Sequence, residues 1–276
     1  MNTDTTEEKP MLALPVMTNQ ILAYIDLLGF KEIIGSADSA KSQSILTLLS
    51  EIYGSRKDFS VITSKMPDIA PPIAIPAISS FSDHVVFSFN LDDPKAKNAT
   101  VYQCLSVVRY AVGNFDRFAR SIGCLVRGAV VTGQLYHAGG VVFGPALVEA
   151  YELERDATVG PRVIVHPNTI KRIGYPEGAS GLFRDQDGFW CLDYMSAQLK
   201  DLANENTLLN EEKRRDLLKI WACNLRADVL KQAKSLEDKG ALRAASKWHS
   251  YAAQFEQSMK RLDGKFFNVD GSAIQF

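Results

Sequence analysis

The sequence predicts an α+β fold, in which an antiparallel-rich sheet carries helices on one face and a helical hairpin follows at the C-terminal end. Three observations predict this class. Up to about residue 195, apolar runs of strand length alternate with longer segments whose apolar residues recur every three or four positions. Two of the strand-like runs fold back around short polar turns, as β-hairpins do. After residue 196 the strand pattern ends, and two long amphipathic segments follow.

The first elements are a strand, a broken helix and a hairpin. Residues 20–28 form an apolar strand, and an amphipathic helix follows to about residue 52, interrupted near "GSADS". The proline-rich stretch at 66–77 suits an extended connection, because each proline removes a donor and fixes φ. Period-two patterns in "ISSFSDHVVFSF" then predict a hairpin over 78–89, with Asp83 at its tip.

The middle of the chain predicts two helices with a strand pair between them. Apolar residues spaced by three and four indicate a helix over 100–121. A strand at 125–132 and a short second arm at 135–143 follow. Pro145 suits the first turn of the next helix, because its missing donor would be unpaired there, and that helix runs to about Ala157.

The remaining elements complete the sheet and form the extension. They are a strand at 161–167, a short helix at 168–173, a hairpin at 181–195 around Asp187-Gly188, and long helices at about 210–236 and 240–262. We therefore expect three parts: a flexible tail at 1–19, a main domain at 20–195 and a helical extension at 196–276. The order of elements in the main domain resembles a ferredoxin-like core with additions.

The composition limits the classes of protein that need to be considered. The 276 residues carry 31 basic and 32 acidic side chains, so the chain lacks the basic surplus of a nucleic-acid-binding protein. No apolar run reaches the length of a membrane span, and the polar, acidic start does not resemble a signal peptide. The four cysteines are scattered, without a CxxC pair. We expect a cytoplasmic protein with reduced thiols and neither a membrane nor a nucleic-acid partner.

Asp26 is the unusual residue of the first strand, because it interrupts the apolar run "AYIDLLGF". A buried carboxylate costs several kcal/mol unless it is paired, protonated or bound to a cation. In a ferredoxin-like core the first strand and the hairpin are neighbours, which would place Asp26 and Asp83 side by side. Each aspartate alone would also suit a turn or a cap. Together they predict a site for one or two divalent cations, since like charges so close repel strongly without a shared cation.

Five motifs in order resemble one protein family. Asp26 stands three residues before Gly29-Phe30, Ser82-Asp83 lies on the hairpin, and the segments "VRGAVVTGQL", "FGPALVEAYELERDA" and "PRVIVHPNTI" follow. In these motifs, over about residues 20–195, the chain is similar to the catalytic domain of class III nucleotidyl cyclases.

The resemblance implies a set of site residues and partners. It implies two metal ions, Mn²⁺ or Mg²⁺, on Asp26, Asp83 and the backbone carbonyl of Leu27. It places the substrate's triphosphate at the amides near Gly29 and Phe30. It also implies a head-to-tail homodimer with active sites between the subunits.

The chain departs from the purine cyclases of that family at four register positions. The purine-reading positions hold Ser79 and Val141, and the positions of the transition-state asparagine and arginine hold Val148 and Glu152. With its aspartates intact, the chain looks most like the bacterial pyrimidine cyclases of the Pycsar anti-phage system. This resemblance implies that UTP, or else CTP, becomes the 3′,5′-cyclic nucleotide and pyrophosphate, and that a separate effector protein is activated by the product.

Further residues are candidates for roles at this site. Arg155, one turn beyond Glu152, is a candidate for the cation that stabilises the transferred phosphoryl group. Arg127 lies on a strand among apolar neighbours and would bind substrate, form an ion pair between subunits, or form a structural ion pair within one subunit. Candidate walls of a base pocket are Ser79, Phe81, Tyr136 and Val141.

Three other interpretations fit parts of the same pattern. Val148 and Glu152 would suit a cyclase-like module that binds a nucleotide or partner without turnover. An adenylyl cyclase would need other residues to read the base, and a cyclic dinucleotide synthase would need a GGDEF-type loop, which the sequence lacks. The four histidines are spread along the sequence and do not suggest a zinc site.

Overall fold

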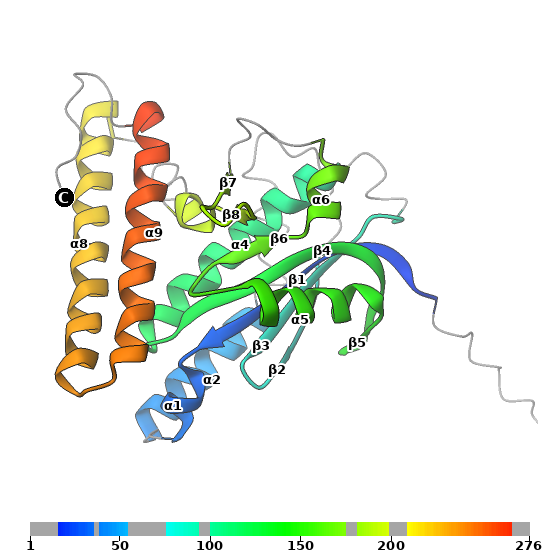
Figure 1. Ribbon diagram of the computed structural model, residues 1–276, viewed down its shortest axis with the longest axis horizontal. Helices are drawn as coiled ribbons and strands as arrows, with labels where there is room; N and C mark the ends of the chain where they lie inside the picture. Colours follow the sequence, from blue (N-terminus) through cyan, green and yellow to red (C-terminus); the bar gives the residue numbers. More distant parts are fainter. Residues whose placement is uncertain are drawn as a thin grey trace, which may run out of the picture.

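The computed structural model describes residues 16–35, 39–54, 76–93, 100–174, 181–198 and 209–266. Almost all of the proline-rich stretch predicted at 66–77, and most of the predicted tail, lie outside these ranges. The described residues form one mixed sheet, two sets of covering helices and a long helical pair at one end (Figure 1).

The sheet has the strand order β2-β3-β1-β4-β6-β8-β7, and β5 pairs with β4 outside this path. The strands are β1 (Thr18–Leu28), β2 (Ala77–Phe81), β3 (His84–Asn90), β4 (Leu125–Ala138), β5 (Val141–Phe143), β6 (Val163–Val165), β7 (Leu182–Arg184) and β8 (Trp190–Leu192). All pairings are antiparallel except that of β4 with β6. The antiparallel-rich sheet predicted from the sequence is therefore confirmed, and β1 lies inside it between β3 and β4.

The helices occupy the positions that the periodic segments predict. They are α1 (Phe30–Gly35), α2 (Ser39–Gly54), α4 (Val101–Ser121), α5 (Pro145–Ala157), α6 (Pro167–Arg172), α8 (Glu211–Asp238) and α9 (Leu242–Phe266). Thr100 begins α4 with a capping box, in which its hydroxyl accepts from the Gln103 amide and the Gln103 side chain accepts from the Thr100 amide. None of the described helices combines the length and the apolar character needed to cross a membrane.

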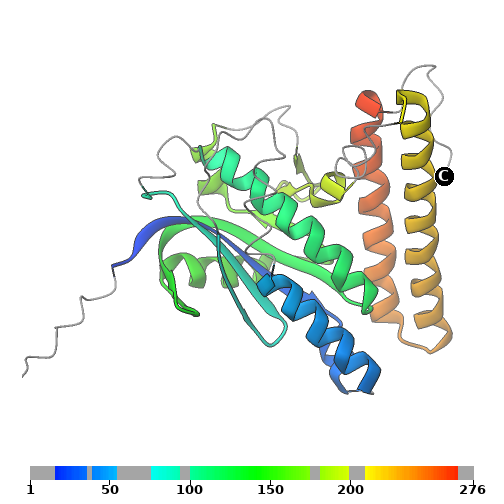
Figure 2. The ribbon, with the colours of Figure 1, turned by 180° about the vertical axis from the view of Figure 1, so that it is seen from behind.

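Helices cover both faces of the sheet, which differs from the prediction of helices on one face. Alternate residues of β1 explain this, because Ile21, Ala23 and Ile25 pack in the large core with α4, whereas Leu22 and Tyr24 pack in a smaller core with α5. Figure 1 shows α5 in front of the sheet, and Figure 2 shows α4 across the opposite face. A β1 strand buried on both faces lacks the polar alternation that would have revealed the second layer.

The turn between β4 and β5 lies later than the sequence suggested. We expected a strand over 125–132 and a short second arm over 135–143, with the turn between them. Instead β4 continues to Ala138, and Gly139 and Gly140 form the turn, both with positive φ. Gly133 lies inside the strand, where an added Cβ would come within 3.2 Å of the Ala146 Cβ. Its small size therefore allows α5 to pack closely on β4.

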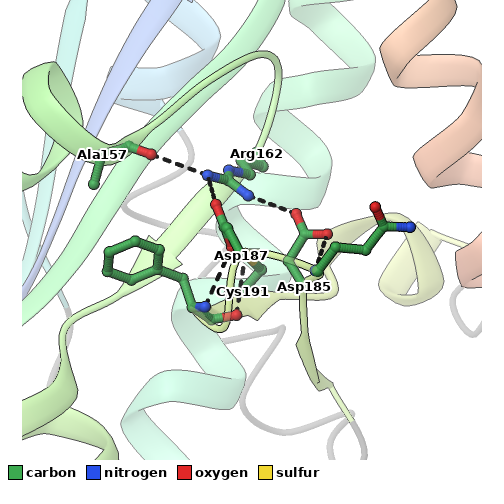
Figure 3. A network of polar contacts seen from close by, with 7 residues as sticks. Ala157, Arg162, Asp185, Asp187 and Cys191 are labelled. Atoms are coloured by element: carbon green, nitrogen blue, oxygen red, sulfur yellow. Dashed lines mark hydrogen bonds and ion pairs between the residues drawn. The ribbon is translucent and has the colours of Figure 1, made fainter.

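Arg162, from the predicted "PRVIV" strand, ties the β7–β8 hairpin to the sheet (Figure 3). Its Nη1 donates to Asp185 Oδ2 at 2.6 Å, and its Nη2 donates to the Ala157 carbonyl at 2.9 Å and to Asp187. The guanidinium is buried, and burial is compensated by these two carboxylates. In this structure the arginine of the motif has a structural role.

The C-terminal helices contribute to the main core, which agrees with the interpretation of this segment as a helical hairpin packed on the main domain rather than an assembly or regulatory surface. Asp116 of α4 is fully buried, and its Oδ2 accepts from the Tyr251 hydroxyl at 2.6 Å, from Gln198 Nε2 at 2.9 Å and from Arg120 Nε at 3.0 Å. Tyr251 belongs to α9, so one carboxylate oxygen joins α4, α9 and the segment before residue 199. The same large core includes Trp248 and Phe255 of α9.

Asp193 makes a second polar connection to α9. Its Oδ1 accepts from the Ser258 hydroxyl at 2.5 Å, and its Oδ2 accepts from Arg261 Nε at 3.1 Å. Arg261 also lies over the Phe183 ring of β7, with its guanidinium carbon 4.0 Å from the ring centroid. The described helices of the extension, α8 and α9, thus pack directly against the main domain.

We predict that Asp116→Ala lowers the free energy of unfolding by about 3–5 kcal/mol, because it leaves the Arg120 guanidinium, which is 11% exposed, without its carboxylate. Denaturant titration at neutral pH measures this change. Asp216→Ala, at an exposed position of α8, is the control and should change stability by less than about 0.5 kcal/mol. Equal stabilities for the two variants would contradict the anchoring role of Asp116.

Candidate functional site

The structure brings Asp26 and Asp83 together at one end of the sheet. β1 and β3 pair so that Asp26 lies directly opposite His84, and the Leu27 amide donates to the Asp83 carbonyl at 3.0 Å. Candidate ligand atoms of Asp26, Asp83 and His84 all lie within 4.8 Å of one another. The neighbouring positions expected for the two aspartates are thus observed, and His84 joins them.

The tight turn of the β2–β3 hairpin explains how Asp83 reaches this place. Ser82 has a φ of 57°, which makes it the one non-glycine with positive φ among the described residues. An L-residue with a side chain is strained in this region, and glycine is not. The Ser82-Asp83 pair therefore occupies a position that favours glycine, in agreement with the Gly-Asp of the family that the sequence resembles.

Asp26 receives its charge partner from the strand on its other side. Arg127 of β4 lies opposite Asp26 in the β1–β4 register, and its Nη2 donates to Asp26 Oδ2 at 2.8 Å. The Asp26 residue is only 7% exposed. An ion pair with a hydrogen bond is one of the arrangements that a buried carboxylate requires. Of the roles considered for Arg127, the structure shows an ion pair within the subunit.

The same guanidinium also contacts Glu154 of α5. Arg127 Nε lies 2.5 Å from Glu154 Oε1, and the Glu154 side chain is 4% exposed. Burial raises the pKa of the Glu154 carboxyl, an effect that Arg127 opposes and that the negative charge of Asp26 reinforces. One cation is thus shared by two buried carboxylates. Glu154 belonged to a motif segment in the sequence, but nothing there identified this contact.

Aromatic side chains surround the acidic cluster. The Tyr24 ring lies 5.0 Å from that of His84 and 6.2 Å from that of Tyr151, centroid to centroid, and the Phe81 and His84 rings are stacked at 5.6 Å. Burial, with the charges of Glu154 and Asp26, raises the pKa of the Tyr24 phenol above its ordinary value, so Tyr24 stays a neutral phenol. The sequence analysis missed Tyr24, although its place two residues before Asp26 puts both side chains on one face of β1.

The predicted base-pocket residues have different environments. Ser79 is buried, and its hydroxyl lies 2.8 Å from His137 Nε2, while His137 Nδ1 lies 2.8 Å from the Ser88 hydroxyl. Phe81 and Val141, in contrast, are 45% and 54% exposed. Tyr136, the fourth predicted wall, has its ring centroid 5.1 Å from that of Phe143. The two positions that align with the purine-recognising residues of the resembling family therefore hold Ser79, whose hydroxyl contacts His137, and Val141, which is exposed.

Arg155 lies on an exposed part of α5. Its Nε and Nη2 donate to the two carboxylate oxygens of Asp156 at 2.6 and 2.7 Å, and its guanidinium carbon lies 5.4 Å from the Tyr151 ring centroid. Val148 and Glu152, on the same helix, are exposed. Among the described arginines, the one that contacts the acidic cluster is therefore Arg127, and Arg155 remains a candidate only.

The turn after β1 holds the residues expected at the triphosphate. Gly29 has a φ of 93°, and its carbonyl accepts from the Ile33 amide at 3.3 Å. Phe30, the first residue of α1, is buried in the large core. The left-handed conformation at Gly29 turns the chain immediately after Leu28, so this backbone turn lies three residues from Asp26.

The donor atoms of the cluster fit a divalent cation. Two carboxylates offer the hard oxygen ligands that Mg²⁺ and Mn²⁺ take, and an imidazole nitrogen suits transition ions. Arg127 occupies Asp26 Oδ2, whereas Asp26 Oδ1 faces His84. The residues that would hold a cation are therefore Asp26 through Oδ1, Asp83 and His84.

Comparison with known proteins gives only distant similarities. No family model matches the chain, and no curated protein matches it. Among solved structures, it is similar to an adenylyl cyclase, CyaB, from P. aeruginosa, with 13% identity, a TM-score of 0.42, and 64% of this chain and 94% of that one covered. It is also similar to the guanylyl cyclase domain of the RhoGC fusion protein from the aquatic fungus Blastocladiella emersonii, with 7% identity, a TM-score of 0.43, and 64% and 95% coverage.

We predict that Asp26→Ala and Asp83→Ala each weaken Mn²⁺ binding about tenfold or more, because each removes a charged oxygen ligand. Calorimetric titration of the nucleotide-free protein measures the affinity. Asp238→Ala, which removes an exposed carboxylate paired with Lys234 on α8, is the control and should bind Mn²⁺ as the wild type does. Undiminished binding by both site variants would show that the cation binds elsewhere.

Proposed function

We propose that the protein is a nucleotidyl cyclase, which converts a ribonucleoside triphosphate into its 3′,5′-cyclic monophosphate and pyrophosphate. The observation that carries this proposal is the meeting of Asp26 and Asp83 at one end of the sheet, beside the Gly29 turn and the Arg127 guanidinium. The order of the five sequence motifs supports it independently. These features suit phosphoryl transfer, which depends mainly on positioning and charge stabilisation.

The reaction needs a 3′-oxygen nucleophile and a stabilised leaving group. Divalent cations, when bound, lower the pKa of the ribose 3′-hydroxyl and neutralise the charge on the phosphates. Asp26 and Asp83 hold these cations, and the Leu27 carbonyl is a further candidate ligand. The 3′-hydroxyl gives its proton to water, the 3′-oxygen forms a bond to the α-phosphorus, the bond from that phosphorus to the bridging oxygen breaks, and pyrophosphate leaves. Backbone amides at Gly29 and Phe30 orient the triphosphate.

Two arginines could stabilise the charge that develops on the α-phosphoryl group. Arg127 is the better placed, because its guanidinium already contacts Asp26 and is held by Glu154. This cation is preorganised, which reduces the cost of reorienting it during the reaction. Arg155 would have to leave its two bonds to Asp156. We therefore assign this role to Arg127 first and to Arg155 second.

For the base, we propose a pyrimidine, with UTP ahead of CTP. The register positions that read purines hold Ser79, whose hydroxyl is engaged with His137, and Val141, which is apolar. Phe81 and His84 offer stacked rings beside the acidic cluster, which would suit a small aromatic base. The preference for uracil and a role of the product as an anti-phage signal, read by a separate effector, come from the resemblance to the Pycsar cyclases alone.

We propose that the active form is a homodimer with substrate between the subunits. Large apolar side chains are exposed at the end of β2, on β5 and on α5. They are Phe81, Val141, Phe143, Val148 and Tyr151, each between 39% and 56% exposed. Large exposed apolar side chains gathered on one side of a protein often mark an interface. A second copy of the chain would cover them and close the site from water.

We predict that the purified protein with Mn²⁺ forms cyclic UMP and pyrophosphate from UTP, when each of the four ribonucleoside triphosphates is supplied separately and products are identified by mass spectrometry. Asp26→Ala should lower the rate about a hundredfold or more, because it removes charge stabilisation at the reacting centre. Asp238→Ala is the control. A cyclic purine nucleotide as sole product would contradict the base assignment, and no product from any triphosphate would favour a binding module.

We predict that Val148→Asp converts the dimer to a monomer and lowers cyclase activity at least about tenfold, because it places a charge in the proposed interface. Light scattering coupled to gel filtration gives the mass. Ile220→Asp, at an apolar position of α8 that is 59% exposed, is the matched control and should leave mass and rate unchanged. A fully active monomeric wild type would refute the shared site.

A further inference from the structure

We propose that a cleft between the Gly29 turn and the C-terminal helices binds a small organic anion with an apolar body. The cleft has a volume of about 930 Å³ and lies where α1, the end of α4 and the α8–α9 pair meet. Figures 1 and 2 both show the turn between α8 and α9 beside the end of α4, with α1 close by. Sites for small ligands commonly have volumes in this range. The proposal goes beyond the proposed function, because it concerns a second site.

The cleft is separate from the acidic cluster. Asp26 belongs to the α5 side of the sheet, since Arg127 links its carboxylate to Glu154 of that helix. The cleft instead lies on the α4 side, where Arg117 and Arg120 form part of its wall. Neither the proposed metal ligands nor Arg127 is among the described residues that line it. A ligand of the cleft would therefore not occupy the proposed metal site.

Basic side chains line two walls of the cleft. They are Arg117 and Arg120, three residues apart on α4, and Arg243 and Lys247, four residues apart on α9. Residues at these spacings share one face of a helix. Two carboxylates, those of Glu32 and Asp228, also line the cleft. The four cations outnumber them, although the whole chain has a net charge of −1, so the cleft favours a negatively charged ligand.

Arg120 is already oriented by the protein. Its Nε donates to Asp116 at 3.0 Å and its Nη2 to Gln198 at 2.9 Å, while its guanidinium carbon lies 5.7 Å from the Tyr251 ring centroid. Nη1 takes part in neither of these bonds, which leaves its two N–H groups for another acceptor. An oxygen atom of an anionic ligand could accept from them without any rearrangement of the arginine.

The apolar part of the lining comes mainly from the C-terminal helices. It includes Leu225, Val229 and Leu236 of α8 and Trp248 of α9. An apolar surface beside cations suits a ligand that combines an apolar body with a phosphate, sulfonate or carboxylate group. An inorganic anion would leave this surface uncovered. The chemistry of the lining therefore indicates an organic anion.

The Gly29 turn is the wall that the cleft shares with the proposed triphosphate site. A Cβ added at Gly29 would lie 3.7 Å from the Gly123 carbonyl oxygen. A Cβ added at Gly123 would lie 3.6 Å from Ile33 Cδ1 and 3.9 Å from Gln232 Nε2 of α8. The two glycine turns therefore lie close together and close to α8. A ligand of the cleft would contact the Gly29 turn from the α4 side.

The test uses 8-anilinonaphthalene-1-sulfonate as the probe, because it has a sulfonate on an aromatic body and reports apolar sites by fluorescence. Titration of the full-length chain, without metal or nucleotide, should show saturable binding. The double variant Arg243→Glu/Lys247→Glu should weaken binding about tenfold or more, because attraction becomes repulsion. Ala244→Phe should weaken it about fivefold or more, because the larger side chain fills part of the cleft at unchanged charge.

The matched control for charge is the double variant Lys213→Glu/Lys219→Glu, at exposed positions of α8 outside the cleft. It should bind the probe as the wild type does. Val148→Asp and Asp83→Ala, which alter the proposed interface and metal site, should also keep wild-type affinity. N-phenyl-1-naphthylamine has the same aromatic body without the sulfonate, and it should bind about tenfold more weakly or less. Thermal unfolding verifies that each variant is folded.

Three outcomes would overturn the proposal. They are a wild-type chain without saturable binding, an unchanged affinity in either cleft variant, and equal affinities for the probe and its neutral analogue. Failure of the proposed function looks different, because the probe would then bind while no triphosphate is cyclised. Conversely, cyclase activity in a chain that does not bind the probe would leave the function intact and remove the second site.

Discussion

The need to compensate the buried negative charge of Asp26 explains which strands and helices meet at this end of the sheet. Asp26 lies near the end of β1, an interior strand of the sheet, and is almost entirely buried, so its carboxylate needs a partner. The two neighbouring strands supply it from opposite sides, with Arg127 of β4 on one oxygen and His84 of β3 facing the other. Glu154 of α5 contacts the same arginine at its Nε. The sheet, the hairpin turn and α5 are thus joined at a single carboxylate.

This arrangement explains how the fold prepares a functional site without a dedicated binding domain. The Asp83 carboxylate has a place beside Asp26 because the Ser82 turn is tight and because the Leu27 amide closes the hairpin against β1. Two carboxylates held so close by backbone geometry repel each other, and a bound divalent cation would remove this repulsion. The same end of the sheet carries the Gly29 turn, where a substrate phosphate would follow the cation.

Much of the fold could be predicted from the sequence, because strand and helix periods are local signals. The hairpin at Asp83, the capped helix α4 and the long terminal helices follow from such patterns. The second helical layer could not, since a strand buried on both faces has no alternation to reveal it. The β4 turn was placed too early because Gly133 is needed for close packing on Ala146, which is a tertiary contact.

Within the site, the sequence could identify the two aspartates but not their partners. Asp26 was conspicuous because it interrupts an apolar run, and Asp83 because it follows a strand at a turn. Tyr24 could have been found from its spacing of two residues from Asp26, whereas Glu154 and His84 had no local signal, because their positions depend on register and packing. The buried Asp116 and its bonds to α9 were hidden for the same reason, since an aspartate on an amphipathic helix usually faces solvent.

The most direct test of the central claim is a crystal structure of the protein soaked with Mn²⁺, with data collected at the manganese absorption edge. We expect an anomalous peak within about 2.5 Å of carboxylate oxygens from both Asp26 and Asp83, at bonding distance for such an ion. A well-ordered manganese peak elsewhere, with the Asp26 and Asp83 oxygens turned away from each other, would contradict the account.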